Sequence, residues 1–102
     1  MPPKLTEEQR RAALAKAAEA RRARAEVKHL LKTGSLDLPE LFARAEADHY
    51  LAGMKVSAVL PSLPGFGKVK AKRLMEELGI SESRKLQGLG TRQRAALLER
   101  FS

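Results

Sequence analysis

Apolar residues recur at helical spacing along most of the chain, and no segment shows the apolar-polar alternation of a strand. The first periodic stretch opens at Thr6-Glu7-Glu8-Gln9, which has the form of a capping box, with Thr6 as N-cap and Gln9 reaching back to it. Gly34 is placed to end this stretch after Lys32-Thr33, because glycine readily adopts the left-handed conformation found after helices. The pattern therefore predicts one long first helix.

Two shorter segments follow with their own start signals. Asp37 has Glu40 three residues later and Pro39 in the first turn, a combination that begins helices. This helix is expected to run through about Ala47, and a further short piece is expected after Asp48.

A short buried helix is predicted in the middle of the chain. Pro61 is expected to kink or shorten it, because proline has no amide proton to donate. The apolar residues that indicate this helix are Met54, Val56, Val59, Leu60 and Leu63.

The C-terminal part predicts two more helices. Residues 68–78 form a helical run that Gly79 ends, Ser81 is placed to cap a short turn, and Thr91 is placed to cap a last helix through Phe101. The side chains expected in the core are Val69, Ala71, Leu74, Met75, Leu78, Ala95, Leu97, Leu98 and Phe101. The predicted fold class is all-α, a long N-terminal helix followed by a small helical core.

The net charge favours a polyanionic partner. The chain has 102 residues, enough for one small domain but not for a large enclosed active site. It carries 20 Lys and Arg against 12 Asp and Glu, a net charge of +8, which favours nucleic acid or an acidic membrane surface. It has no cysteine, so disulfides and thiolate metal sites are excluded. The start MPPKLTEEQRR has no signal-peptide core and no segment is apolar enough to span a membrane, so we expect a soluble cytoplasmic protein.

Charge also divides the chain. Residues 35–53 carry one basic and four acidic side chains, whereas the segments on both sides are basic. We interpret 35–53 as a packing or solvated face that does not touch phosphate. The expected organisation is a basic helical arm with a partly flexible N-terminus over residues 1–34, and a compact helical core over 35–102.

A basic stripe runs along the first helix. At about 100° per residue, five basic side chains fall within an arc of roughly 80°, opposite a cluster of three glutamates. The stripe consists of Arg10, Arg21, Arg24, Lys28 and Lys32. Bulky apolar residues come only near the end of this helix. Two interpretations stay open: a solvated helix that frays, or an arm that lies along phosphates and becomes ordered there.

The segment Pro64-Gly65-Phe66-Gly67 predicts a turn between two helices that can hold a phosphate. Its two glycines remove side chains that would keep an anion away, and they permit positive φ. Amides in the turn and in the first turn of the next helix can then face the anion, helped by the helix dipole. Phe66 is expected to point inward, and Lys68, Lys70 and Lys72 to add charge. A plain corner between two helices is the alternative.

This turn belongs to a longer pattern that resembles the helix-hairpin-helix family of sequence-neutral DNA binders, with Ala71 placed to face the partner helix. Over nearly the whole chain, the Arg-rich alanine helix and the blocks MKVSA, GKVKA and GLG are similar to the actinobacterial integration host factor family. The resemblance implies an all-helical, nucleoid-associated protein with a helix-two-turns-helix core related to that of a small-subunit ribosomal protein. It also implies duplex DNA binding and bending with little sequence preference, in chromosome organisation and in phage site-specific recombination.

The resemblance places the DNA contacts in two segments. The phosphate-binding turn falls on residues 64–68, and a second loop, usually Arg-Arg-x-Arg-Gly-Leu-Gly, falls on residues 84–90. Here Lys85 and Gln87 replace two arginines, which loses bidentate geometry at one position and charge at the other, and Pro61 stands where an acidic residue is typical. The expected contact residues are Pro64, Gly65, Phe66, Gly67, Lys68, Lys70, Arg84, Lys85, Gln87, Gly88 and Arg92.

The second loop makes the same case from its residues alone. Gly88-Leu89-Gly90 precedes the expected cap Thr91, with Arg92 and Arg94 in the first turn of the helix. Cations at a helix N-terminus oppose the dipole, at a cost of a few tenths of a kcal/mol that a nearby phosphate would remove. Two such points would fix the protein on the backbone without reading base edges, and would stabilise a bend between them.

Catalysis is not expected. Pro2 is followed by Pro3 and not by the glutamate that proline-nucleophile repair enzymes need, and residues 79–102 lack the aspartate of hairpin-containing glycosylases. His29 and His49 have no ligand spacing, so we expect neither a metal nor a cofactor.

Three kinds of partner suit a basic chain of this size: double-stranded DNA, structured RNA and another protein. Aromatic residues make up 4% of the chain, and Phe42, Tyr50 and Phe101 are expected in the core, which argues against stacking of single-stranded bases. Structured RNA, or association with the ribosome, is the alternative, and a protein adaptor working through residues 35–53 is a third. The sequence favours a monomeric, architectural protein of the nucleoid that binds double-stranded DNA.

Overall fold

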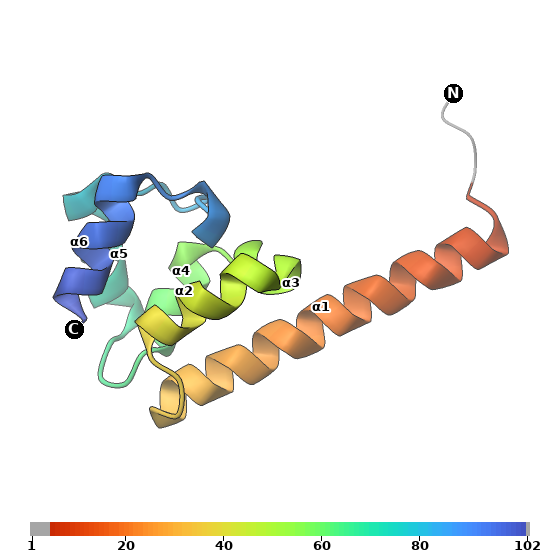
Figure 1. Cartoon of the computed structure of the whole chain (residues 1–102), viewed down its shortest axis with the longest axis horizontal. Coiled ribbons are helices and arrows are strands. Elements are labelled where there is room, and N and C mark those ends of the chain that lie inside the picture. Colours follow the sequence, from red (N-terminus) through yellow and green to blue (C-terminus); the bar gives the residue numbers. More distant parts are fainter. Residues whose placement is uncertain (1–4, 102) are drawn as a thin grey trace.

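Six α-helices and two short 3-10 helices account for the elements of the computed structural model, which describes residues 5–101 (Figure 1). The elements are α1 (Glu7–Thr33), α2 (Leu38–Ala47), α3 (His49–Ala52), α4 (Val56–Val59), η1 (Leu60–Ser62), α5 (Lys68–Leu78), η2 (Leu86–Gly88) and α6 (Thr91–Arg100). In the described residues no strand forms, and only an isolated antiparallel bridge pairs Lys55 with Lys85. The predicted all-α class is confirmed.

Helix α1 begins and ends where its local signals predict. The Gln9 amide donates to Thr6 Oγ1 at 3.1 Å and the Thr6 amide donates to Gln9 Oε1 at 2.9 Å, which completes the capping box. Gly34 ends the helix with a φ of 78°. At 1.5 Å per residue the 27 residues span about 40 Å, and the N-terminal half projects beyond the other helices (Figure 1). The longest dimension of the molecule, 47 Å, follows from this projection.

The core lies under the C-terminal end of α1. Of this helix only Val27 and Leu31 are buried, and Ala23 and Leu30 pack against the core. The other buried residues come from the elements after α1: Leu36, Leu38, Leu41, Phe42, Leu51, Met54, Val56, Val59, Leu60, Leu63, Ala71, Leu74, Met75, Ile80, Leu86 and Leu97. The first half of α1 therefore has no apolar anchor of its own.

Tyr50 joins α3 to α1 at the surface, not in the core where it was expected. Its hydroxyl donates to Glu19 Oε2 at 3.0 Å, and its carbonyl accepts from Arg24 Nε at 3.3 Å. The phenol is amphipathic, and its polar end finds a carboxylate on the neighbouring helix. Glu19 is the first residue of α1 that these contacts reach.

Pro61 shortens the buried central helix as predicted. Helix α4 ends at Val59, and the chain continues as η1 with Pro61 in its first turn. Ser62 Oγ donates to the Ala58 carbonyl at 3.0 Å, which satisfies an acceptor at the end of the shortened helix.

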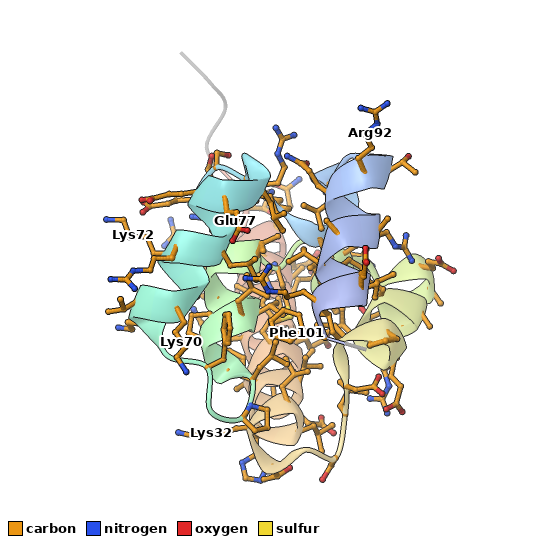
Figure 2. All side chains as sticks on the ribbon, turned by 90° about the vertical axis from the view of Figure 1, so that its left-hand side faces the viewer. Lys32, Lys70, Lys72, Glu77, Arg92 and Phe101 are labelled. Carbon is orange, nitrogen blue, oxygen red and sulfur yellow. The ribbon has the colours of Figure 1, made fainter. Side chains whose placement is uncertain are left out.

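Helices α5 and α6 run antiparallel (Figures 1 and 2). Gln93, near the start of α6, donates to the carbonyl of Gly79 at the end of α5 at 3.0 Å. At the other end of the pair, the Phe101 ring meets the Phe66 ring edge to face, with centroids 5.1 Å apart. The N-termini of the two helices therefore lie at opposite ends of the pair.

Three expectations in this region are wrong. Val69 is 67% exposed, because α5 buries the face of Ala71, Leu74 and Met75, and a residue two positions before Ala71 points away from it. Ala95 is exposed for the same kind of reason on α6. Thr91 does not cap α6: it is the first helical residue, and Gly90 is the N-cap.

Candidate nucleic-acid interface

The turn before α5 is closed by its own backbone and by one aromatic contact. The Phe66 amide donates to the Leu63 carbonyl at 3.1 Å, and Gly65 has a φ of 70°, which a residue with a side chain adopts only with strain. Phe66 is half-buried against Phe101, so the expected inward orientation holds, and Pro64 is exposed. Phe66 thus fixes the turn and leaves its backbone on the surface.

Gly67 has no structural reason to be glycine. Its φ is −87°, an ordinary value, and a Cβ built on it would meet nothing within 4 Å. Of the two glycines, only Gly65 therefore uses the positive φ that glycine permits. Gly67 is the N-cap of α5 and makes no side-chain capping bond, although Ser, Asp or Asn there would stabilise the helix. What its missing side chain provides is free space in front of the helix.

The first amides of α5 face that space. The first bond of the helix runs from the Ala71 amide to the Gly67 carbonyl at 3.0 Å, so the amides of residues 68–70 precede the hydrogen-bond ladder. Lys68 and Lys70 are exposed beside them, and Lys70 Nζ lies 3.5 Å from the Gly65 carbonyl oxygen. Figure 2 shows Lys72 extending outward from α5 and Lys70 lying at the end of α5 next to the turn. Amide donors, the positive end of the α5 dipole and lysine side chains therefore lie together at the N-terminus of α5, as in anion-binding sites.

The second loop is braced by one of its own arginines. Arg84 Nη1 donates to the Gly88 carbonyl at 3.0 Å, and a Cβ on Gly88 would lie 3.3 Å from Arg84 Cδ. Gly88 thus allows Arg84 to fold over the loop. Leu86 anchors the loop in the core, whereas Lys85 and Gln87 are exposed.

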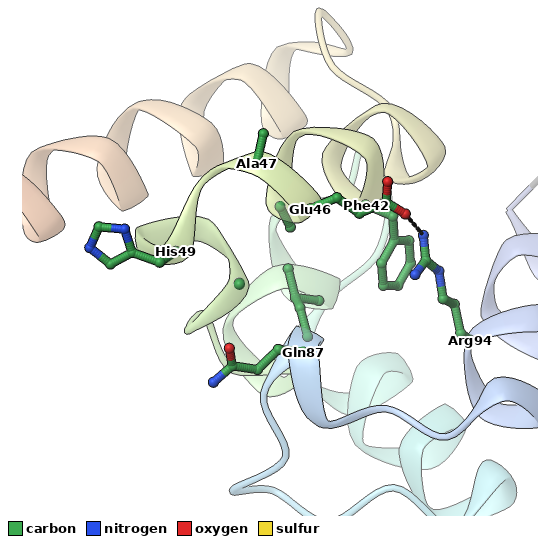
Figure 3. Close-up of a pocket in the computed structure, with 9 residues that line it drawn as sticks. Phe42, Glu46, Ala47, His49, Gln87 and Arg94 are labelled. Atoms are coloured by element: carbon green, nitrogen blue, oxygen red, sulfur yellow. Dashed lines mark hydrogen bonds and ion pairs between the residues drawn. The ribbon is translucent and has the colours of Figure 1, made fainter.

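The N-terminus of α6 presents one free arginine and one engaged arginine. Arg92 is exposed and points away from the helix pair (Figure 2). Arg94 does not: its Nη2 lies 3.1 Å from Glu46 Oε1, and its guanidinium sits 4.7 Å from the centre of the Phe42 ring. Both partners line a cavity of about 450 Å³ together with Arg94 and Gln87 (Figure 3). The expected conflict of Arg94 with the dipole is thus relieved by a carboxylate within the protein.

The basic stripe of α1 divides into two parts. Arg10 lies on the projecting half, and Arg21, Lys28 and Lys32 are exposed on the half that packs on the core. Arg24 is half-buried because it bonds the Tyr50 carbonyl. Lys55, which the sequence did not single out, lies opposite Lys85 in the bridge. Only an apolar-basic-apolar triplet at residues 54–56 could have hinted at it.

The described residues were also compared with what a metal site and a membrane-spanning helix require. In residues 5–101, His, Asp and Glu side chains form no group of three or more suited to a metal ion. No helix within this part of the chain combines the length and apolarity needed to cross a membrane.

Comparison with known proteins first defines the class. The model of the S13-like H2TH domain matches residues 31–101, the end of α1 and all the elements after it. The core is therefore an H2TH domain whose two glycine-containing turns each precede a helix.

Full-length relatives narrow the class further. Integration host factor proteins of Mycolicibacterium smegmatis and Mycobacterium tuberculosis are each 59% identical over 99 residues, 97% of this chain and 94% of each relative. That of Streptomyces coelicolor is 56% identical over 97% of this chain and 92% of its own. The solved structure of sIHF bound to an 8-bp palindromic DNA superimposes with a TM-score of 0.82 at 52% identity, over 86% of this chain and 99% of that one. The chain belongs to the integration host factor family, which confirms the resemblance drawn from the sequence.

Proposed function

We propose that this protein binds duplex DNA through its phosphate backbone, as an architectural component of the nucleoid. Two phosphate-holding turns, at residues 64–68 and 84–90, carry the contacts, and the basic stripe of α1 adds a less specific surface. The observation that carries the proposal is Gly67. Neither φ nor packing requires a glycine there, and Ser, Asp or Asn would cap the helix slightly better, whereas a phosphate in front of α5 needs the space.

The two turns suit a duplex because they are held apart. Helix α5 separates them, and its 11 residues are about 16 Å long. Contacts at both ends would fix the protein's orientation and support a bent duplex, with no base edge read. The proposal includes DNA bending, a part in chromosome organisation and assistance to phage recombination. It also takes the protein to be monomeric, cytoplasmic and without enzymatic activity.

Duplex DNA is favoured over structured RNA by the relatives. The sIHF structure that superimposes on this chain is bound to a palindromic DNA, and the curated relatives carry the integration host factor name. The aromatic side chains offer no platform for unpaired bases. Phe42 lies under Arg94, Phe66 and Phe101 pack on each other, and Tyr50 bonds Glu19.

Substitution of Gly67 tests the proposal without damage to the fold. Gly67→Asp adds a capping carboxylate, so the free energy of unfolding should stay unchanged or rise by a few tenths of a kcal/mol. The same carboxylate occupies the phosphate position, so we expect affinity for a duplex to fall at least tenfold. Gly67→Ser caps without charge and serves as the matched control, with a much smaller loss.

The measurement is a gel shift on circularly permuted DNA, with an RNA duplex of the same sequence as competitor, alongside urea unfolding. We expect DNA to outcompete RNA and migration to report a bend. Equal affinity of Gly67→Asp and wild type would make the turn a plain corner. Equal competition by RNA would favour the ribosomal alternative.

A further inference from the structure

Four cationic side chains from three parts of the chain surround one small cavity. The cavity, about 300 Å³, lies between α1, the segment after α3 and the second loop, and its lining includes Arg24, Lys28, Lys55 and Lys85. No described residue in the lining is acidic. This basic cavity is separate from both helix N-termini discussed above.

Two of the lysines are brought together by the backbone. The Val56 amide donates to the Arg84 carbonyl and the Leu86 amide donates to the Met54 carbonyl, each at 2.9 Å. These bonds flank Lys55 and Lys85, which makes the two lysines a non-hydrogen-bonded antiparallel pair. Opposite residues in such a pair have Cα atoms about 4.5 Å apart and side chains on the same face. Two like charges placed this way are destabilising unless an anion lies between or above them.

Arg24 is positioned in the same cavity by a different device. Its Nε donates to the Tyr50 carbonyl at 3.3 Å, which holds the guanidinium against the core. A Cβ on Gly53 would lie 3.2 Å from Arg24 Nη2, so the missing side chain of Gly53 gives the guanidinium its place. Lys28 lies one helical turn further along α1 and lines the same cavity.

We propose that the basic cavity is a third phosphate-holding site, occupied by a backbone phosphate of the duplex. The inference rests on the proposed function. Lys85 belongs both to the second loop and to the cavity, so a strand held by the loop continues onto α1 at Arg24 and Lys28. The contact of α1 with DNA is then built by the core and is not a diffuse attraction along the stripe.

Neutralising one lining lysine should remove one phosphate contact. In Lys55→Gln or Lys28→Gln, the slope of log affinity against log salt becomes shallower by about 0.9. Between about 50 and 200 mM salt, the factor by which affinity falls is then about three times smaller in the variant than in wild type. Lys16→Gln is the matched control, because it removes the same charge from an exposed position of α1 outside the cavity and the stripe, and its slope should match wild type.

Gly53→Ala separates a built site from general charge. The substitution keeps every charge, and the backbone φ of −82° at Gly53 suits alanine, but the new methyl group would lie 3.2 Å from Arg24 Nη2 and push the guanidinium by a few tenths of an ångström. We expect a severalfold loss of affinity with an unchanged melting temperature. In the wild-type protein, a chemical-shift change at the Gly53 amide when duplex is added would locate the phosphate. Pyrophosphate serves as the comparison anion.

The possible failures are distinguishable. If Gly67→Asp loses binding while Lys55→Gln behaves like Lys16→Gln and Gly53→Ala like wild type, the third site is overturned and DNA binding stands. If pyrophosphate shifts Gly53 but the duplex does not, the assignment to the DNA backbone is wrong. If Gly67→Asp binds as wild type does, the turn at residues 64–68 is a plain corner and the proposed mode of phosphate binding fails.

Discussion

Tyr50 shows how one side chain connects the arm to the core. The pKa of its phenol is raised, chiefly because the hydroxyl donates to the Glu19 carboxylate, with desolvation and the charges of Glu19 and Asp48 adding to the effect. Ionisation would replace this hydrogen bond by a repulsion between two anions. The contact therefore stabilises α1 on the core only while the phenol keeps its proton.

The tyrosine titration tests this contact. The chain has one tyrosine and no tryptophan, so tyrosinate absorbance reports Tyr50 alone. We expect the titration midpoint of Tyr50 to be lower in Glu19→Gln than in the wild-type protein. The stabilising contribution of the pair is complete below the ordinary pKa of tyrosine and is lost as pH rises through the raised value. Identical midpoints in the two proteins would mean that the hydroxyl and Glu19 do not meet in solution.

Residues also mark where sequence reasoning succeeded. The cap at Thr6 and Gln9 was predictable because its partners lie three residues apart, and Pro61 because its missing amide acts locally. Arg94 was misread because its partner Glu46 lies 48 residues away, beyond any local pattern. Lys55 was missed for the same reason.

At the scale of the elements, one ring contact sets the position of the 64–67 turn. Phe66 precedes α5 and Phe101 follows α6, and their rings meet at an interplanar angle of 79°. This edge-to-face contact joins the ends of an antiparallel helix pair that is also linked by the surface ion pair of Arg100 with Glu77 and the bond from Gln93.

A double-mutant cycle measures that contact. Phe66→Leu and Phe101→Leu should each destabilise the fold, and their coupling free energy should be about 0.5–1.5 kcal/mol in urea unfolding. Phe66→Leu combined with Leu14→Ala is the control pair, because Leu14 is exposed in the first half of α1, away from both rings, and these two effects should add. A coupling indistinguishable from that of the control pair would show that the rings pack independently.

The bounds of the longer helices α1, α2, α5 and α6 were predictable to within a residue or two, whereas η2 was not predicted and the buried faces were harder to place. Leu74 and Met75 were placed correctly by periodicity, but Val69 satisfies the same apolar criterion and is exposed. Periodicity counts apolar positions, and it does not say how far along a helix the neighbouring core extends. The bridge at residues 55 and 85 had no counterpart in any local pattern.

At the scale of the whole molecule, the C-terminal half of α1 stabilises the fold, whereas the N-terminal half projects from it. The buried residues of α1 are Val27 and Leu31, whereas Arg10 lies on the projecting half. A chain that starts at Lys16 should therefore have a free energy of unfolding within about 0.5 kcal/mol of that of the full chain, as for changes at exposed positions. The salt slope of duplex binding should become shallower by about one unit for each arm cation that contacts phosphate. A large loss of stability would mean that the outer half packs on the core.

Under the proposed function, helix α5 is a spacer of fixed length between the two turns proposed to hold phosphates. Its 11 residues are a rigid rod of about 16 Å, and they offer the duplex no adjustment. DNA must supply the adjustment instead, so sequences with easily opened pyrimidine-purine steps reach the required phosphate separation at lower cost. With these proposed contacts, the protein would select genomic sites by how easily the DNA deforms, even though it makes the same contacts at every one.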